Sequence, residues 1–167
     1  MSREGALLVM VGVAVVLLAL LAWAWVRRTR RDARYSAPVG ELAEGAVETA
    51  VFSGLYVATT RHDEPLERLA IKGLGFRSRL DVTVTTAGVA LDLRGQPRIV
   101  LDRDRLVDAA QATVAIDRVV ERDGLTRVSW RIDDETVVDT YLRPQDASAK
   151  ALADAIRPLI TTTGSDA

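Results

Sequence analysis

The chain has 167 residues, and its 22 basic and 23 acidic side chains give a formal net charge of −1. It contains no cysteine and one histidine, which excludes structural disulfides, thiolate nucleophiles and metal centres built from cysteine or from several histidines. The charges are segregated: residues 1–34 contain six arginines and two acidic residues, whereas the other 133 residues contain 16 basic and 21 acidic ones, a net charge of −5.

The first expected element is a membrane-spanning helix over residues 6–26. These 21 residues carry no charge, and twelve of them are Leu or Val. A helix of that length spans roughly 31 Å, which matches a hydrocarbon core of about 30 Å. Trp23 and Trp25 lie at its end, where amphipathic rings favour the membrane interface.

The charges that flank this segment predict its orientation. Five arginines follow it, whereas Arg3 beside Glu4 precedes it. The positive-inside rule therefore places residues 27–167 in the cytoplasm and residues 1–5 outside, as in a single-pass protein of the cell membrane. A signal peptide cleaved at Ala22-Trp23-Ala24 is the alternative, but the apolar run exceeds the usual 7–15 residues and one arginine precedes it. The arginines that set the topology are Arg27, Arg28, Arg30, Arg31 and Arg34.

Residues 27–46 read as an Arg-rich, flexible juxtamembrane linker, because Pro38, Gly40 and Gly45 interrupt any regular pattern. From about residue 47 the sequence changes to short apolar alternations separated by turns, the signature of half-buried strands. Expected strands are Val51–Thr60, Leu80–Thr85, Val89–Arg94, Arg98–Leu101, Val114–Val120, Val128–Ile132 and Thr136–Leu142, with a hairpin turn at Asp123-Gly124.

The last apolar segment has helical spacing instead. We expect an amphipathic helix from Pro144, a favourable first helical residue, to Ile160, with Pro158 kinking or ending it. Residues 161–167 are expected to be a flexible tail. The prediction is thus one mainly β domain over 47–160, with about seven strands bent into a barrel or sandwich, Trp130 in its core and a helix closing its open end.

This order of elements resembles the pleckstrin-homology (PH) fold, a seven-stranded open barrel capped by one helix. Four short stretches resemble, more narrowly, a family of membrane-anchored PH-like proteins from actinobacteria that are often encoded beside pyrimidine-biosynthesis genes and labelled export or transporter proteins. The resemblance implies a fold and a membrane anchor, and it transfers no catalytic residue. The stretches are Gly54–Thr60, Gly73–Ser78, Ala87–Val89 and Val128–Arg131.

Lys72, Arg77 and Arg79 form the strongest candidate binding site, for the phosphate of a lipid head group. The resemblance implies this role, because phosphoinositide-binding PH domains hold the head group with basic residues near the first hairpin. The acidic domain argues against it, since an anionic leaflet repels net negative charge unless a local patch dominates. A basic loop that is solvated, or salt-bridged to nearby acidic residues, is therefore the favoured interpretation. Gly73-Leu74-Gly75 lacks the remaining residues of a phosphate-binding motif and is expected to be a turn.

Other candidate chemistry is weaker. His62, beside Asp63 and Glu64, is expected to be an exposed turn residue because no second histidine accompanies it. Asp102, Asp104 and Asp108 lack the spacing of a calcium loop. We therefore expect no catalytic residue, cofactor or metal. Nucleic-acid binding is also disfavoured, because the domain is acidic and 5% of the chain is aromatic.

The sequence thus predicts a non-catalytic, membrane-anchored PH-like module that serves as a protein-interaction or scaffold domain at the cytoplasmic face. Its expected partners are the bilayer and an unidentified membrane-associated protein, and the sequence leaves its oligomeric state open. Two alternatives remain open: a domain that senses anionic lipid or another phosphate ligand, and an auxiliary subunit of a membrane transporter or enzyme complex.

Overall fold

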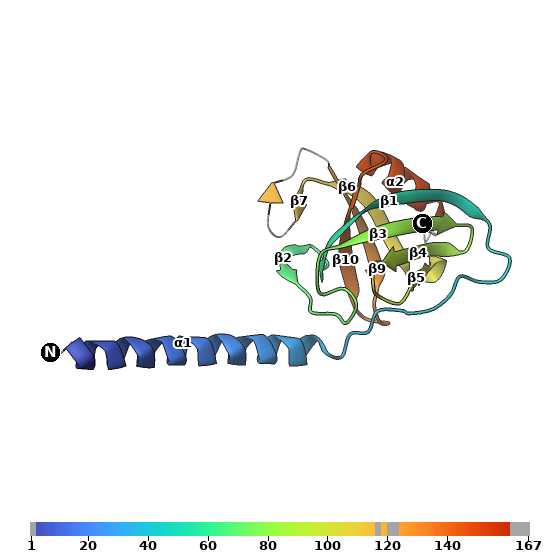
Figure 1. Cartoon of the computed structure of the whole chain (residues 1–167). Coiled ribbons are helices and arrows are strands. Elements are labelled where there is room, and N and C mark those ends of the chain that lie inside the picture. Colours follow the sequence, from blue (N-terminus) through green and yellow to red (C-terminus); the bar gives the residue numbers. More distant parts are fainter. Residues whose placement is uncertain (1–2, 116–117, 120–123, 161–167) are drawn as a thin grey trace, which may run out of the picture. The chain divides into compact units, whose positions relative to one another are not determined.

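The computed structural model describes residues 3–115, 118–119 and 124–160. The chain divides into two compact units, Met1–Arg34 and Tyr35–Ala167. The first unit contains helix α1 (Arg3–Asp32), and the second is a β-sheet domain with a short helix (Figure 1).

Helix α1 is apolar on all sides over most of its length. Its large apolar side chains from Leu7 to Trp25 are exposed, so the helix would be unfavourable in water unless another apolar phase covered it. By length and composition, Leu7–Asp32 is able to cross a membrane, although an N-terminal signal sequence meets the same criteria. At its end the Arg27 guanidinium lies over the Trp23 ring, 5.4 Å from the centroid. The finding agrees with a membrane anchor and does not determine its orientation.

Seven strands follow one another across an antiparallel sheet in the order β5-β4-β3-β1-β10-β9-β6 (Figure 1). The long strand β1 joins the two halves, because it pairs with β3 on one side and β10 on the other. Gly54 lies where β1 meets β10, and a Cβ there would come within 2.4 Å of the Arg143 carbonyl oxygen. The bounds are β1 Glu48–Arg61, β3 Ser78–Thr85, β4 Gly88–Leu93, β5 Ile99–Asp102, β6 Leu106–Ala112, β9 Leu125–Arg131 and β10 Val137–Pro144.

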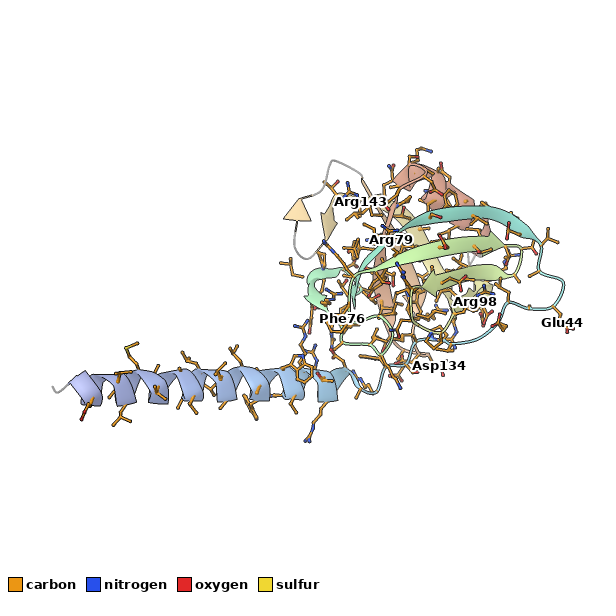
Figure 2. All side chains as sticks on the ribbon, viewed as in Figure 1. Glu44, Phe76, Arg79, Arg98, Asp134 and Arg143 are labelled. Atoms are coloured by element: carbon orange, nitrogen blue, oxygen red, sulfur yellow. The ribbon has the colours of Figure 1, made fainter. Side chains whose placement is uncertain are left out.

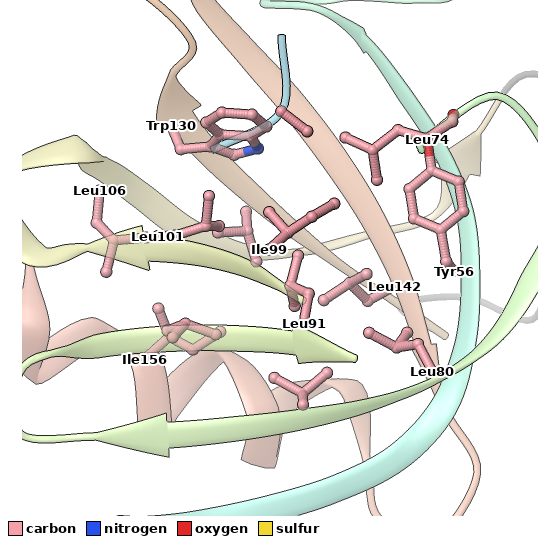
Figure 3. Packing of buried hydrophobic residues seen from close by; sticks show 14 of the residues in the cluster. Tyr56, Leu74, Leu80, Leu91, Ile99, Leu101, Leu106, Trp130, Leu142 and Ile156 are labelled. Carbon is pink, nitrogen blue, oxygen red and sulfur yellow. The ribbon is translucent and has the colours of Figure 1, made fainter. Parts of the chain in front are cut away.

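The inner face of this sheet encloses one large apolar core (Figure 3). Its members alternate along each strand, as the period-2 pattern predicts: Leu80, Val82 and Val84 of β3 are all buried. Trp130 is fully buried, which confirms it as a core residue. Every buried member of this core lies between Tyr35 and Leu159, so the domain carries its own core without α1.

Helix α2 (Ala149–Ile156) packs against the core through Leu152 and Ile156 and is followed by the 3₁₀ turn η2 (Arg157–Leu159). It begins later than the sequence predicts, because Pro144 ends β10 instead of starting the helix. The true start is Ser148, whose hydroxyl accepts a hydrogen bond from the Ala151 amide (3.1 Å). Pro158 lies within η2, beyond the regular helix, as expected.

One barrel strand lies earlier in the chain than the sequence predicts. The strand next to β9 is β6, which begins after a 3₁₀ turn, η1 (Arg103–Arg105), in a stretch read as a charged turn. Val114–Ala115 (β7) and Arg118–Val119 (β8) form a separate two-stranded sheet, so the expected strand over 114–120 is wrong. The short strand β2 (Glu64–Arg68), which pairs with β1, was not expected. Asp123 and the tail 161–167 lie outside the described residues.

The structure also differs from the expected linker over 27–46. Helix α1 continues to Asp32, and the β domain begins at Tyr35. The Tyr35 and Ala37 side chains are buried, Val39 pairs with Ile99 of β5, and the Val100 amide donates to the Pro38 carbonyl (2.8 Å). Residues 35–40 therefore cover the edge of β5, which would otherwise present unpaired backbone groups.

Candidate functional site

The loop between β2 and β3, residues 69–77, is held from the inside and exposed on the outside. The side chains of Leu69, Ile71 and Leu74 are at most 1% exposed and belong to the core. Between them, Gly73 has φ +87°, a conformation that residues with a Cβ rarely adopt. The 69–77 loop is therefore a fixed structure despite its lack of regular hydrogen bonding.

A chain of buried hydrogen bonds fixes this loop further. The Tyr56 hydroxyl donates to the Leu74 carbonyl (2.6 Å) and lies 3.0 Å from the Thr59 hydroxyl, which lies 2.9 Å from that of Thr140. The Trp130 indole donates to Thr140 (2.8 Å). Because a carbonyl only accepts and a phenol has one proton, Thr59 must supply the proton it shares with Tyr56. Burial raises the pKa of Tyr56 to about 12, so the phenol keeps the proton that binds Leu74.

The outer side of the loop borders a hollow of about 410 Å³ that three basic side chains surround. Lys72 and Arg77 come from the loop, and Arg94 comes from the turn after β4 (Gly88–Leu93). Phe76 lines the same hollow and is 87% exposed (Figure 2). An exposed phenylalanine among basic side chains is typical of a surface that binds an anionic, partly apolar partner.

Arg79 lies outside this hollow. It lines a neighbouring one of about 500 Å³ on the outer face of the sheet, which it shares with Arg94 and the acidic residues Asp81 and Asp92. Asp92 is paired with Arg98 through two hydrogen bonds (2.7 and 3.0 Å), and Asp81 accepts one from Ser53 (2.6 Å). The structure thus brings Lys72 and Arg77 together, places Arg79 next to them, and adds Arg94, which the sequence analysis missed.

His62 belongs to a second polar cluster, on the outer face of the sheet just after the last residue of β1, Arg61. Its Nδ1 lies 2.9 Å from Oδ1 of Asp139, a fully buried carboxylate that also accepts hydrogen bonds from the Ser129 hydroxyl (2.6 Å) and the Asp63 amide (3.1 Å). Three donors therefore satisfy a charge that would be costly to bury alone. The cluster clasps the turn after β1 onto β9 and β10, a role that the sequence did not reveal.

This clasp has neither the geometry of a nucleophilic triad nor a favourable field for a cation. Asp139 lies between the serine and the histidine, whereas a triad needs the histidine next to the nucleophile. Ligand atoms of His62, Asp63 and Asp139 lie within 4.8 Å of one another, close enough to surround an ion. However, the Asp139 oxygens already accept three hydrogen bonds, and an Arg127 nitrogen lies 3.8 Å from Asp63.

Of the three aspartates at and after the end of β5, Asp108 is held in an ion pair. Asp104 lies in η1, and Asp108 pairs with Arg127 (2.8 Å). Burial alone would lower the pKa of Arg127, but Asp108 and Asp139 raise it above its ordinary value. Asp102, Asp104 and Asp108 do not form a group of metal ligands within the described part of the chain.

Fold and site together define a helix-capped, open β barrel of the PH-like class, with a basic, aromatic-tipped loop at one end. The chain belongs to the bacterial PH domain-like family, whose model matches residues 36–157. Among solved structures, the chain is similar to the C-terminal domain of an unknown protein from Leishmania infantum, with 9% identity and a TM-score of 0.45 over 83% of this chain and 97% of that one. No curated protein matches the sequence.

Proposed function

We propose that this protein is a non-catalytic recognition module, tethered to the membrane by α1, whose 69–77 loop binds phosphate groups of anionic lipids. The observation that carries the proposal is the hollow formed by Lys72, Arg77 and Arg94 beside the exposed Phe76. Domains of this class are generally non-catalytic, and this hollow contains cations without a nucleophile–base pair.

Two physical terms favour a bilayer surface as the ligand. Each cation near an anionic surface contributes about 1 kcal/mol, and burying a phenylalanine side chain contributes about 1.5–3 kcal/mol. The buried contacts of the loop hold the backbone that carries these side chains in place before binding, which lowers the entropic cost of docking. The net negative charge of the domain acts against binding, so the basic end has to face the bilayer.

The tether supports this function. Ala33 and Arg34 alone separate α1 from the domain, so the domain would remain at the surface of whichever leaflet it faces. Weak lipid affinity then suffices, because the tether raises the effective concentration of head groups. We place the domain on the cytoplasmic side, since the arginines after Val26 favour that orientation.

Flotation of residues 35–167 with phosphatidylcholine vesicles, with and without phosphatidylglycerol, tests the proposal. We expect binding that requires phosphatidylglycerol, falls with salt, and is lost on charge reversal of Lys72 and Arg77, the two basic residues that the loop contributes to the hollow. Phe76→Ala should weaken binding about tenfold or more, from the burial term alone. Equal flotation with both vesicle types, or none with either, would refute lipid recognition by this loop.

Orientation needs a separate experiment. The chain contains no cysteine, so Asp134→Cys, in the exposed turn before β10, provides a single label site. We expect an impermeant maleimide to label it only after cells are opened. Labelling in intact cells would reverse the proposed topology.

A protein-binding scaffold, the function that the sequence favoured, is the second candidate. Leu66 of β2 and Phe76 are 73% and 87% exposed, and aromatic side chains such as Phe76 are enriched at protein interfaces. A stoichiometric partner that co-purifies with the full-length protein in detergent, and is lost with Leu66→Ala, would favour this function. The link to pyrimidine genes and an actinobacterial origin remain expectations from the resemblance and identify no ligand.

A further inference from the structure

Three arginines form a row across the outer face of the sheet, beside the hollow described above. Arg79 on β3 and Arg143 on β10 both lie directly opposite Leu55 of β1. Directly paired residues of antiparallel strands point to the same face, so the two arginines share the face of Leu55. Arg94 extends the row, because its amide donates to the Arg79 carbonyl (3.1 Å) and places it opposite Arg79.

The face in question is the outer one. Leu80 and Leu142, the neighbours of Arg79 and Arg143, are buried in the core, so the arginines point away from it. All three arginines are exposed, and Figure 2 shows Arg79 and Arg143 on this part of the domain. With a strand spacing of about 4.8 Å, the row Arg94–Arg79–Leu55–Arg143 is about 14 Å long.

The row is unfavourable for the free protein. Like charges directly opposite each other on neighbouring strands, as Arg79 and Arg94 are, destabilise a sheet, and Arg143 lies on the far side of Leu55 from Arg79. Among the residues that the structure describes, none of these three arginines forms an ion pair, although Asp81 and Asp92 lie nearby in the adjacent hollow. Those two carboxylates are instead engaged by Ser53 and Arg98. A row of cations that the described part of the fold leaves without an ion-pair partner points to a ligand outside it.

We propose that the arginine row is a second phosphate-binding surface, contiguous with the hollow through Arg94, which borders both. This inference rests on the proposed function and extends it from one head group to several. One phosphate cannot contact all the arginines of a row about 14 Å long. A bilayer surface presents several phosphates side by side, so different arginines of the row can each contact one. The domain then docks through the outer face of β3, β1 and β10 as well as through the loop tip.

Arg143→Gln tests the row because the substitution removes one positive charge at a position that is distant from the loop in sequence. We expect about fivefold weaker binding of residues 35–167 to phosphatidylcholine–phosphatidylglycerol vesicles, the equivalent of about 1 kcal/mol for one cation at an anionic surface. The matched control is Arg131→Gln. Arg131 is exposed on β9 opposite Val137, six residues along β10 from Arg143 and thus about 20 Å away. It should change binding less than twofold.

The outcomes separate the row from the hollow. If Arg143→Gln binds like the parent while Lys72→Gln weakens binding, the row is refuted and the proposed function stands. If the parent domain does not bind the vesicles, both fail. A fivefold loss for Arg143→Gln and Arg131→Gln alike reports net charge alone and refutes the row.

A second arm distinguishes lipid phosphate from free phosphate. Inorganic phosphate is titrated while the backbone amide signals of Arg79, Arg94 and Leu55 are followed by NMR, with chloride at equal ionic strength as the reference. For a bilayer ligand we expect equal, small shifts with both salts. Saturable shifts with phosphate alone would make free phosphate the ligand of the row and refute its role in docking to lipid.

Discussion

Replacing Tyr56 with phenylalanine should loosen the binding loop without touching any of its charges. The substitution removes the Tyr56 hydroxyl. The buried Leu74 carbonyl then loses its hydrogen bond of 2.6 Å, and the Thr59 hydroxyl loses a partner at 3.0 Å. Leu74 is 0% exposed, so water does not replace the lost donor. A buried polar group left unsatisfied costs about 1–3 kcal/mol, against a total stability of about 5–15 kcal/mol for a typical domain.

Urea denaturation of residues 35–167 measures this cost, and hydrogen exchange locates it. We expect unchanged m-values, a loss of about 2 kcal/mol, and faster exchange of the amides in residues 71–78. Vesicle binding should weaken although every basic residue is present. Tyr141→Phe is the control, because Tyr141 belongs to the smaller cluster of Val57, Ala58 and Leu125 and not to the loop. If Tyr56→Phe leaves the stability and the hydrogen exchange of the loop amides unchanged, the chain of buried hydrogen bonds does not hold the loop.

Four further predictions test the fold and its charges. Gly54→Ala should destabilise the domain by several kcal/mol, since its Cβ would lie 2.4 Å from a backbone oxygen, whereas Gly40→Ala, with no atom within 4 Å, should leave the urea midpoint nearly unchanged. Asp139→Ala should cost about 3 kcal/mol or more by thermal or urea unfolding, because it leaves Ser129 and the Asp63 amide without their acceptor; a cost below that of His62→Ala would contradict the clasp. A chain that begins at residue 47 should aggregate or unfold, unlike one that begins at 35, because it lacks Tyr35 and Ala37 and exposes the edge of β5; a cooperative melt equal to that of 35–167 would contradict this. Finally, the stability of the domain should fall as the pH rises from 10 to 12. Burial raises the pKa of Tyr56 to about 12 from its ordinary 10, so the unfolded chain loses this proton at a lower pH than the folded one. Burial also raises the pKa of Tyr141. Tyr56→Phe should reduce that loss, and an unchanged pH profile would contradict the assignment.

Local patterns sufficed to predict much of the sheet. The alternation in Leu80–Thr85 and Val89–Arg94 identified β3 and β4, because one face of each is buried. Strand β6 escaped prediction because Leu106–Ala112 has few large apolar residues and follows a run of charges. Residues 35–40 escaped it as well, since Pro38 and Gly40 read as breakers, and their pairing with β5 depends on residues some 60 positions later in the chain.

The candidate site was predicted in part. Lys72, Arg77 and Arg79 stood out because they are close in sequence. Arg94 and Arg143 did not, since only the register of β4, β3, β1 and β10 aligns them with Arg79. The clasp around Asp139 was hidden for the same reason: nothing in the sequence shows that an aspartate within a strand meets a histidine 77 residues earlier.

The most direct test of lipid recognition by the 69–77 loop is hydrogen exchange of the full-length protein in nanodiscs. Discs of phosphatidylcholine alone are compared with discs that also contain phosphatidylglycerol, so α1 is embedded in both and the lipid charge alone differs. We expect slower exchange in residues 71–79 and 93–95 only in the anionic discs, reversed by high salt. Identical exchange in the two kinds of disc would contradict it.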